Sequence, residues 1–240
     1  MSSDDRPTVL VVQNGKNGGP RRFGDWLVED RLRLDVVHAY DGATPPETLT
    51  HDAVLVLGGG YMPDADDRAP WLAQTRALVA EALPRGVPVF GICLGGQLLA
   101  HVAGGAVKAD AGAPETGSVP VSVRPEAATD PLFHDLPSTV PAIEHHVDAV
   151  TALPADAVWL AQTERCPYQA FRVGERAWGV QFHPEVTADR IAQWDADKLR
   201  REGHDRDEVL ARALADEPVS TPVWREVCRR FATVVHESAA

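Results

Sequence analysis

The stretch that decides the fold is residues 89–100, Val89-Phe90-Gly91-Ile92-Cys93-Leu94-Gly95-Gly96-Gln97-Leu98-Leu99-Ala100. An apolar run typical of a buried strand ends at a single cysteine, and an apolar, helix-forming run begins directly after it. This order predicts a nucleophile elbow, a sharp strand-to-helix turn that lifts a reactive side chain above a sheet. The N–H groups and the dipole of the following helix favour the thiolate form of Cys93, which is the form that attacks.

Short apolar strands alternate with helical stretches through the first half of the chain. Strands are predicted over 8–12, 34–40, 53–57 and 88–92, and helices over 21–31 and 69–82. The alternation predicts an α/β fold, an open, mostly parallel sheet with helices on both faces. Later strands, over 119–123, 158–161, 168–172 and 177–182, add an antiparallel region with a hairpin at 174–175. A helical tail is expected over 188–237, interrupted at Gly203 and Pro218.

Composition narrows the class of partner. The formal net charge of −12 argues against nucleic acids and anionic membranes as partners. No apolar run approaches the length of a membrane span, and the polar, acidic start does not resemble a signal peptide. The three cysteines, Cys93, Cys166 and Cys228, are far apart, which predicts neither a disulfide framework nor a zinc site and fits a cytoplasmic protein.

The chain also offers a base and a residue to orient it. Residues 182–185 read Phe182-His183-Pro184-Glu185 at the end of a predicted strand. His183 can accept the thiol proton, and Glu185 can turn back onto the imidazole and hold its tautomer. Each residue alone has a plainer interpretation: a buried core thiol, a strand-end histidine and a solvated glutamate. Together they predict a Cys93–His183–Glu185 triad.

An oxyanion site is predicted at the same edge of the sheet. The strand over 53–57 ends in Gly58-Gly59-Gly60, and open α/β sheets place their sites at the carboxyl ends of strands. Glycine lets backbone N–H groups approach a ligand closely. We therefore expect an N–H group of this loop to act with the N–H group of Leu94.

Three motifs, over 57–60, 91–97 and 182–185, together resemble those of class I (triad-type) glutamine amidotransferases. The segment from Gly60 to Leu72 looks like the stand-alone, GMP-synthase-like branch of that family. The resemblance implies a flavodoxin-like class I amidotransferase fold. The resemblance runs from about Thr8 to Glu185 and implies a glutamine amidotransferase domain over 8–186. Outside it we expect a flexible N-terminus over 1–7 and a helical C-terminal extension over 187–240 packed on the same domain.

The resemblance also implies an activity and a set of residues for it. The activity is hydrolysis of the glutamine side-chain amide through a γ-glutamyl thioester on Cys93, with ammonia released for an acceptor on a separate synthase subunit. Gly60 and Leu94 match the oxyanion donors of the family, and Gln97 matches a substrate-contacting glutamine. The implied oxyanion and substrate-binding positions are Gly59, Gly60, Leu94, Gln97, His146, Val147 and Asp148.

Two departures from the family pattern keep other functions open. Gly96 stands where relatives usually have a larger residue, and Val147 replaces the glycine of a His-Gly-Asp loop. A γ-glutamyl amide or peptide hydrolase is therefore an alternative, and a non-catalytic binding or regulatory module is another. His145, His146 and Asp148 fit no common zinc spacing, and residues 15–19 lack the register of a phosphate loop, so neither a metal nor a cofactor is expected.

Overall fold

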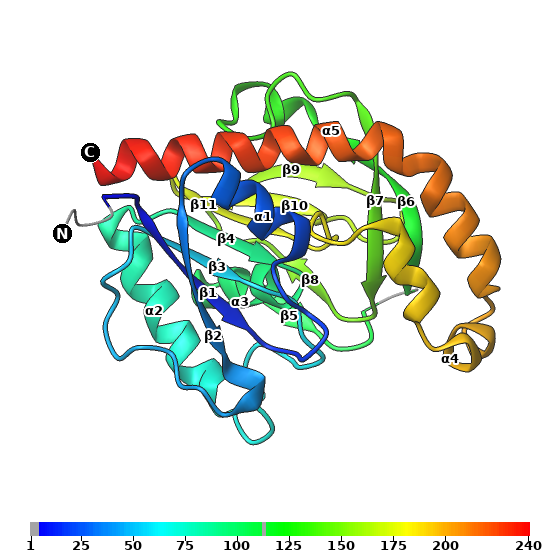
Figure 1. The fold of residues 1–240 in the computed structure, drawn as a ribbon, viewed down its shortest axis with the longest axis horizontal. Coiled ribbons are helices and arrows are strands. Elements are labelled where there is room, and N and C mark those ends of the chain that lie inside the picture. Colours follow the sequence, from blue (N-terminus) through cyan, green and yellow to red (C-terminus); the bar gives the residue numbers. More distant parts are fainter. Residues whose placement is uncertain (1–4, 112–113) are drawn as a thin grey trace.

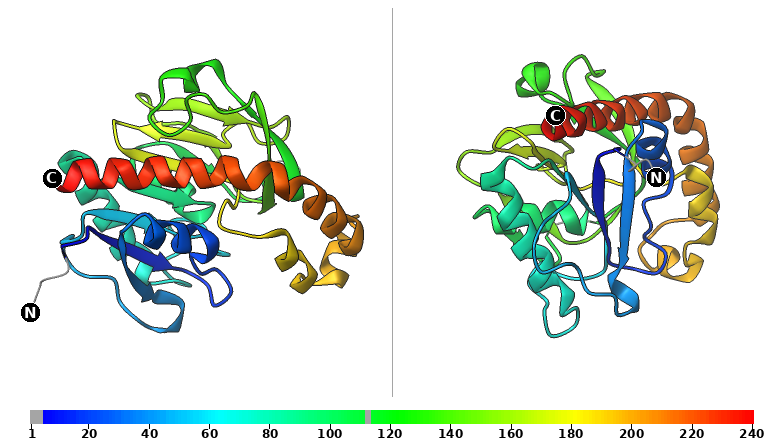
Figure 2. Two further views of the ribbon diagram at one scale, coloured as in Figure 1. Left: turned by 45° about the horizontal axis from the view of Figure 1, so that its top comes forward. Right: turned by 60° about the vertical axis from the view of Figure 1, so that its left-hand side comes forward.

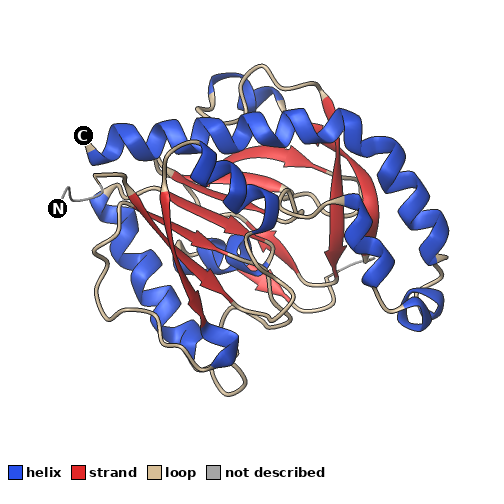
Figure 3. Ribbon diagram, viewed as in Figure 1, coloured by secondary structure: helices blue, strands red, loops and turns tan. Residues whose placement is uncertain are grey.

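The computed structural model of the chain describes residues 5–111 and 114–240, so part of the N-terminal segment predicted to be flexible, residues 1–4, lies outside it. Figures 1 and 3 show its helices and strands. In chain order these are β1 (Thr8–Gln13), α1 (Arg21–Glu29), β2 (Arg33–His38), η1 (Ala39–Asp41), β3 (Ala53–Val56), α2 (Trp71–Arg85), β4 (Val89–Ile92), α3 (Leu94–Val102), β5 (Ala106–Lys108), β6 (Glu115–Val123), η2 (Pro125–Thr129), β7 (Thr139–His146), β8 (Ala149–Ala152), β9 (Val158–Gln162), β10 (Ala170–Val173), β11 (Ala177–Val180), η3 (Ala188–Gln193), α4 (Ala196–Arg201) and α5 (Arg206–Ala239).

Nine of the described strands form one sheet in the order β2-β1-β3-β4-β11-β10-β9-β6-β7. Neighbouring strands from β2 to β11 run parallel, and those from β11 to β7 run antiparallel. The predicted α/β fold, with a parallel sheet and an added antiparallel region, is confirmed. β10 and β11 also form the predicted hairpin, with Gly174 in a left-handed conformation at φ 57°.

The parallel part of the sheet is buried on both faces. Along β1, Val9 and Val11 pack into one hydrophobic cluster, whereas Leu10 and Val12 pack into another. The first cluster includes side chains of α1 and α5, and the second includes side chains of α2 and α3. Figure 2 shows how these helices are arranged around the sheet. Because successive side chains of a strand point to opposite faces, a nearly continuous apolar strand requires such a double cover.

The C-terminal helix α5 lies along the sheet next to α1 (Figure 2). Its side chains Trp224, Val227 and Phe231 are buried in the same cluster as the parallel strands. The predicted break at Pro218 is wrong: α5 runs unbroken from 206 to 239 with that proline inside it, and Figure 1 shows the helix curving instead. Proline removes one backbone hydrogen bond and bends a helix, and packing on the sheet maintains the remaining turns. The predicted break at Gly203 corresponds to the gap between α4 and α5.

The sequence analysis missed three strands, β5, β7 and β8. β5 and β8 form a small antiparallel sheet of their own, and β7 pairs with β6 at the edge of the large sheet. Among the described residues, no helix combines the length and the apolar character needed to cross a membrane.

The topology brings three strand ends together. β3, β4 and β11 are adjacent and parallel, so the loops that follow them leave the sheet at one edge. These loops carry the glycine run 58–60, Cys93 and His183 respectively. The fold therefore assembles the three sequence motifs before any side chain is considered.

Candidate functional site

Cys93 lies in the sharp turn between β4 and α3. Its backbone has φ 51° and ψ −108°, a left-handed conformation that is strained for a residue with a side chain. The turn is held by a hydrogen bond from the Cys93 N–H to the carbonyl of Val180 at 2.8 Å. The residue is buried, with 8 % of its surface exposed. This geometry is that of the nucleophile elbow predicted from the sequence.

Two glycines allow α3 to begin directly on the sheet. A Cβ on Gly95 would lie 2.0 Å from the carbonyl oxygen of Val56, and a Cβ on Gly96 would lie 2.8 Å from that of Val180. Both contacts are with backbone, which cannot move aside as a flexible side chain can. Gly96, where relatives usually have a larger residue, is therefore a packing requirement of this chain.

His183 and Glu185 lie beside the cysteine. The Nδ1 atom of His183 is 2.8 Å from Oε1 of Glu185, and Glu185 is buried. A Cβ on Gly58 would lie 3.0 Å from Cε1 of His183 and 3.5 Å from Cβ of Cys93, so the two side chains flank this glycine. The structure thus brings together all three residues of the predicted triad.

The surroundings of His183 favour its protonated form. Burial lowers the pKa of His183, but the charges of Glu185 and Cys93 and the hydrogen bonds to both groups raise it further, and the net pKa is well above 6.5. An imidazolium here can stabilise a thiolate and can deliver a proton to a leaving amine. The site is therefore arranged for nucleophilic attack by sulfur.

The predicted oxyanion residues lie at the elbow and along the cavity that Cys93 lines. Leu94 is the first residue of α3, so its N–H group has no intrahelical acceptor. Gly59 packs against the side chain of Leu94, where an added Cβ would lie 2.9 Å from Cδ2. Gly60 lines the cavity, with open space where a side chain would be. Both predicted sources of N–H donors are therefore next to Cys93.

A cavity of about 560 Å³ opens over the triad. One wall comes from the loop after β1, and another from residues 145–148. A third wall is formed by the segment after the triad, which was predicted to be a helical extension packed on the same domain but not to contain site residues. This third wall consists of Val186, Arg190, Gln193, Trp194, Lys198 and Glu202.

The loop at 146–148 is held from several sides. The carbonyl oxygen of Asp148 accepts hydrogen bonds from Nε2 of Gln97 at 2.9 Å and from Nδ1 of His146 at 3.1 Å. The carbonyl of Val147 accepts one from the Ala111 N–H at 3.0 Å. Val147 does not adopt a left-handed conformation, so this position of the loop does not require a glycine. All four of the predicted substrate residues, Gln97 and 146–148, line the cavity.

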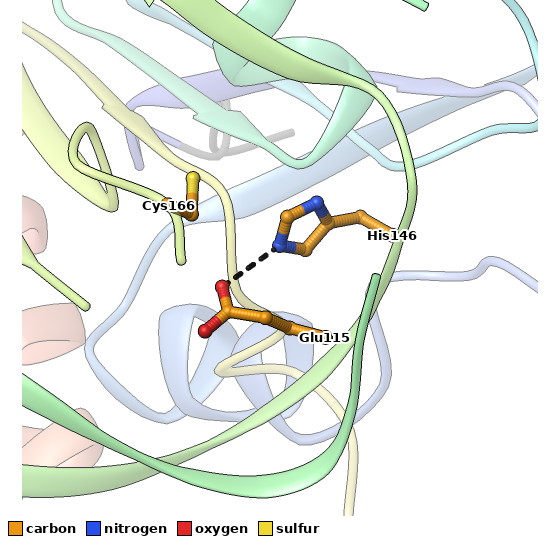
Figure 4. A group of neighbouring side chains, drawn as sticks. All are labelled: Glu115, His146 and Cys166. Carbon is orange, nitrogen blue, oxygen red and sulfur yellow. Dashed lines mark hydrogen bonds and ion pairs between the residues drawn. The ribbon is translucent and has the colours of Figure 1, made fainter. Parts of the chain in front are cut away.

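A buried polar cluster lies behind His146 (Figure 4). Glu115, His146 and Cys166 each bring one ligand atom to within 4.8 Å of the other two. The Nε2 atom of His146 is 3.2 Å from Oε2 of Glu115 and 3.5 Å from Oε2 of Glu144. Gln169 donates to the same Glu115 oxygen at 2.7 Å. Carboxylate, imidazole and thiol are zinc ligands, but here Glu115 already pairs with His146 and Gln169, and this pairing fixes His146 at the cavity wall.

Glu144, which also belongs to this cluster, has no surface exposure. Neither of its carboxyl oxygens has a hydrogen-bond partner among the described residues. Burial raises the pKa of Glu144 well above 4.5, and the charge of Glu115 raises it further. The folded protein therefore favours a protonated Glu144, which limits the charge buried behind the site.

Sequence reasoning missed several residues of this site. Gln181 contacts the sulfur of Cys93, and Arg190 and Lys198 face the cavity. A glutamine inside an otherwise apolar strand, two residues before the predicted base, was an available signal for Gln181. For Arg190 and Lys198 no local signal exists, because only the fold brings their segment over the triad.

The chain is similar in sequence to enzymes named GMP synthase. GMP synthases [glutamine-hydrolyzing] from Aliivibrio fischeri and Vibrio cholerae are 40% and 45% identical over 134 residues, which is 55% of this chain and 24% of each relative. The chain thus spans about a quarter of the length of the curated relatives it matches. A solved glutamine amidotransferase from Thermotoga maritima has a TM-score of 0.84 at 26% identity, over 95% of this chain and 98% of that one.

The family comparison covers the fold and the site together. The family described as Glutamine amidotransferase class-I matches residues 26–194, a segment that contains the glycine loop, the elbow and the His183–Glu185 pair. This match extends over well more than half of the chain, and we conclude that the chain belongs to the class-I glutamine amidotransferase family.

Proposed function

We propose that this chain hydrolyses the side-chain amide of glutamine and releases ammonia for an acceptor on a separate synthase subunit. The observation that carries the proposal is the arrangement of Cys93, His183 and Glu185 at one cavity, with the imidazole 2.8 Å from the carboxylate. The family membership and the relatives named as glutamine-hydrolysing enzymes support glutamine as the substrate.

In the first half of the proposed reaction, the sulfur of Cys93 attacks the amide carbon of glutamine and a C–S bond forms. His183, which carries the thiol proton, delivers it to the amide nitrogen as the C–N bond breaks. Ammonia leaves, and a γ-glutamyl thioester remains on Cys93. The raised pKa of His183 suits this role, because the ring must hold its proton until the leaving group takes it.

In the second half, water replaces ammonia. His183, now neutral, accepts a proton from the water as its oxygen attacks the thioester carbon. The C–S bond breaks, glutamate leaves, and the proton stays with the Cys93–His183 pair. The N–H groups of Leu94 and of Gly59 or Gly60 stabilise the oxyanion that forms in both halves. Glu185 keeps the ring in the orientation that both transfers need.

Substrate positioning is assigned to the loop at 146–148 together with Gln97. These residues line the cavity next to Cys93, and their mutual hydrogen bonds hold them in place. We assign to them the α-amino and α-carboxylate ends of glutamine. A cytoplasmic location fits a nucleophilic thiol together with two further free cysteines, Cys166 and Cys228, because thiols stay reduced there.

The acceptor of the ammonia is assigned to another polypeptide of the synthase type. The support is the similarity to enzymes named GMP synthase, which match this chain over only 24% of their length. We propose no cofactor for the hydrolysis itself, because the triad supplies the nucleophile, the acid and the base.

A second candidate function is hydrolysis of γ-glutamyl conjugates whose leaving amine is larger than ammonia. The size of the cavity favours it, as does the wall formed by Arg190, Trp194 and Lys198. The Nε atom of Arg190 is buried and has no hydrogen-bond partner among the described residues. A guanidinium and an ammonium group at this wall suit a leaving amine that carries a carboxylate, as in a γ-glutamyl peptide.

The test is a substrate comparison on the purified chain and its Cys93→Ser variant. Glutamate and ammonia are measured from glutamine, and glutamate and glycine from γ-glutamylglycine. Release from glutamine that is lost in Cys93→Ser supports the first candidate. Turnover of γ-glutamylglycine without turnover of glutamine supports the second candidate, provided that the turnover of γ-glutamylglycine is lower in Arg190→Gln than in the wild type. If neither substrate is turned over, with or without a synthase subunit, and a glutamine-analogue electrophile leaves Cys93 unlabelled, the chain is a non-catalytic module.

A further inference from the structure

The sulfur of Cys93 has a neighbour that the triad does not include. The side-chain amide of Gln181 places Nε2 3.4 Å from Sγ of Cys93. Gln181 directly follows β11, and it is buried with 3 % of its surface exposed. The amide therefore meets the sulfur in a place that bulk water barely reaches.

The polarity of this amide is fixed by the groups behind it. The Oε1 atom of Gln181 accepts a hydrogen bond from Nε2 of Gln97 at 3.1 Å. The same Nε2 atom donates to the backbone carbonyl of Asp148, and a carbonyl can only accept. Gln97 must therefore present its NH2 group to both partners. If the Gln181 amide were flipped, two NH2 groups would face each other, so Gln181 turns its own NH2 group toward the sulfur.

One more contact strengthens this orientation. Nδ1 of His146 is 3.1 Å from the same Asp148 carbonyl, and the buried cluster around Glu115 holds the other side of that ring. A continuous chain of hydrogen bonds thus runs from the buried cluster through Asp148, Gln97 and Gln181 to the sulfur. From the Asp148 carbonyl to the sulfur each link constrains the next, because every acceptor there faces an NH2 group.

We propose that Gln181 is a further catalytic residue, an N–H donor that stabilises the thiolate of Cys93, and that Gln97 is the positioning residue that aims it. The proposal rests on Cys93 being the nucleophile of the proposed function. A hydrogen bond to an ionised acceptor is stronger than one to a neutral acceptor, so the donor favours thiolate over thiol. It acts twice, on the attacking sulfur and on the sulfur that leaves when water cleaves the thioester.

The experiment measures alkylation of Cys93 by iodoacetamide as a function of pH, followed by mass spectrometry, in the wild type and in Gln181→Met. Methionine keeps the length and the burial of the side chain but has no N–H donor. The signal reports on Cys93, because Cys166 and Cys228 are buried and burial raises the pKa of both thiols. A Cys93→Ser sample gives the background.

We expect Gln181→Met to be alkylated about tenfold more slowly at pH 7, with its pH dependence moved upward by about one unit. Gln181→Glu, which puts a carboxylate at the sulfur, is expected to react more slowly still. Gln97→Met is expected to move the profile in the same direction by less. The matched control is Gln13→Met, which removes another buried glutamine at a strand end whose amide bonds Gly15 and His38 and not Cys93.

An alkylation profile of folded Gln181→Met that superimposes on the wild type would overturn the proposal. If Gln181→Met does not fold, Gln181→Glu carries the same test, and a wild-type profile there overturns the proposal equally. The readout does not depend on turnover of glutamine. A shifted profile in a chain that fails to hydrolyse glutamine supports the donor and removes only the proposed substrate.

Discussion

Trp224 of α5 packs against the residue that precedes His183, the proposed catalytic base, and its replacement tests how α5 is joined to the site. Its ring is 1 % exposed and lies 4.5 Å from the ring of Phe182, the residue before His183. Its Nε1 atom donates to the carbonyl of Pro141 in β7 at 2.9 Å. We propose that residues 187–240 fold as part of the same domain as the sheet, so loss of this ring destabilises the whole chain.

The size of the effect follows from these contacts. Replacing a buried tryptophan with alanine removes the ring and leaves a cavity, which costs about 3–5 kcal/mol of unfolding free energy. Trp224→Phe keeps most of the apolar contact but leaves the Pro141 carbonyl without its donor, which costs about 1–2 kcal/mol. Leu214→Ala on the same helix is the control, because Leu214 is 49 % exposed and its loss costs at most about 0.5 kcal/mol.

The assay is equilibrium unfolding in urea, followed by far-ultraviolet circular dichroism and by tryptophan fluorescence. We expect one transition by both probes, displaced strongly in Trp224→Ala, moderately in Trp224→Phe and hardly in Leu214→Ala. The reasoning is refuted if Trp224→Ala unfolds within about 1 kcal/mol of the wild type. A separate early transition of α5 would refute it as well, since the helix would then be a folding unit of its own.

Three further predictions concern the titratable groups. Glu185→Gln is expected to lower kcat/KM for glutamine by about two to four orders of magnitude, because the imidazole loses the partner that holds its tautomer; steady-state ammonia release measures this. The pH profile of kcat is expected to rise on the acid side and to fall only well above pH 6.5, because the raised pKa of His183 keeps the ring protonated beyond that pH. In Glu185→Gln the fall on the alkaline side is expected at lower pH, because the carboxylate that raises this pKa is gone. Folded Glu144 keeps a proton that the unfolded chain releases near pH 4.5, so wild-type stability falls by about 1.4 kcal/mol per pH unit above that value until the buried group ionises. Glu144→Gln removes this loss, and urea titrations should show its advantage over the wild type growing from about pH 5 to pH 7; an advantage independent of pH would contradict the assignment.

The sequence was sufficient for those parts of the fold whose signals are local. Each parallel strand is a short apolar run, and the cysteine between two such runs has few structural interpretations. β7 could not be found in this way, because Pro141, Glu144 and two histidines interrupt its apolar pattern. β7 is held in the sheet by its pairing with β6, and its His146 is buried in a hydrogen-bonded cluster; neither feature is visible in the apolar pattern.

The same distinction applies to the candidate site. Cys93, His183 and Glu185 could be predicted because their motifs sit at strand ends, where topology brings them together. The contact of Gln181 with the sulfur depends on a hydrogen-bond chain between segments far apart in sequence, which no spacing rule encodes. The predicted helix break at Pro218 is wrong for a related reason: the packing of α5 on the sheet overrides the local preference of proline to end a helix.

The covalent intermediate on Cys93 is the most direct test of the account. The chain is mixed with glutamine, quenched in acid within the first turnovers, and analysed by intact and peptide mass spectrometry. We expect one added glutamyl group, located on the peptide that contains Cys93, absent from Cys93→Ser and strongly reduced in His183→Asn, which can neither maintain the thiolate nor protonate the leaving ammonia. Release of glutamate without any adduct on Cys93, or an adduct on Cys166 or Cys228 instead, would contradict the central claim.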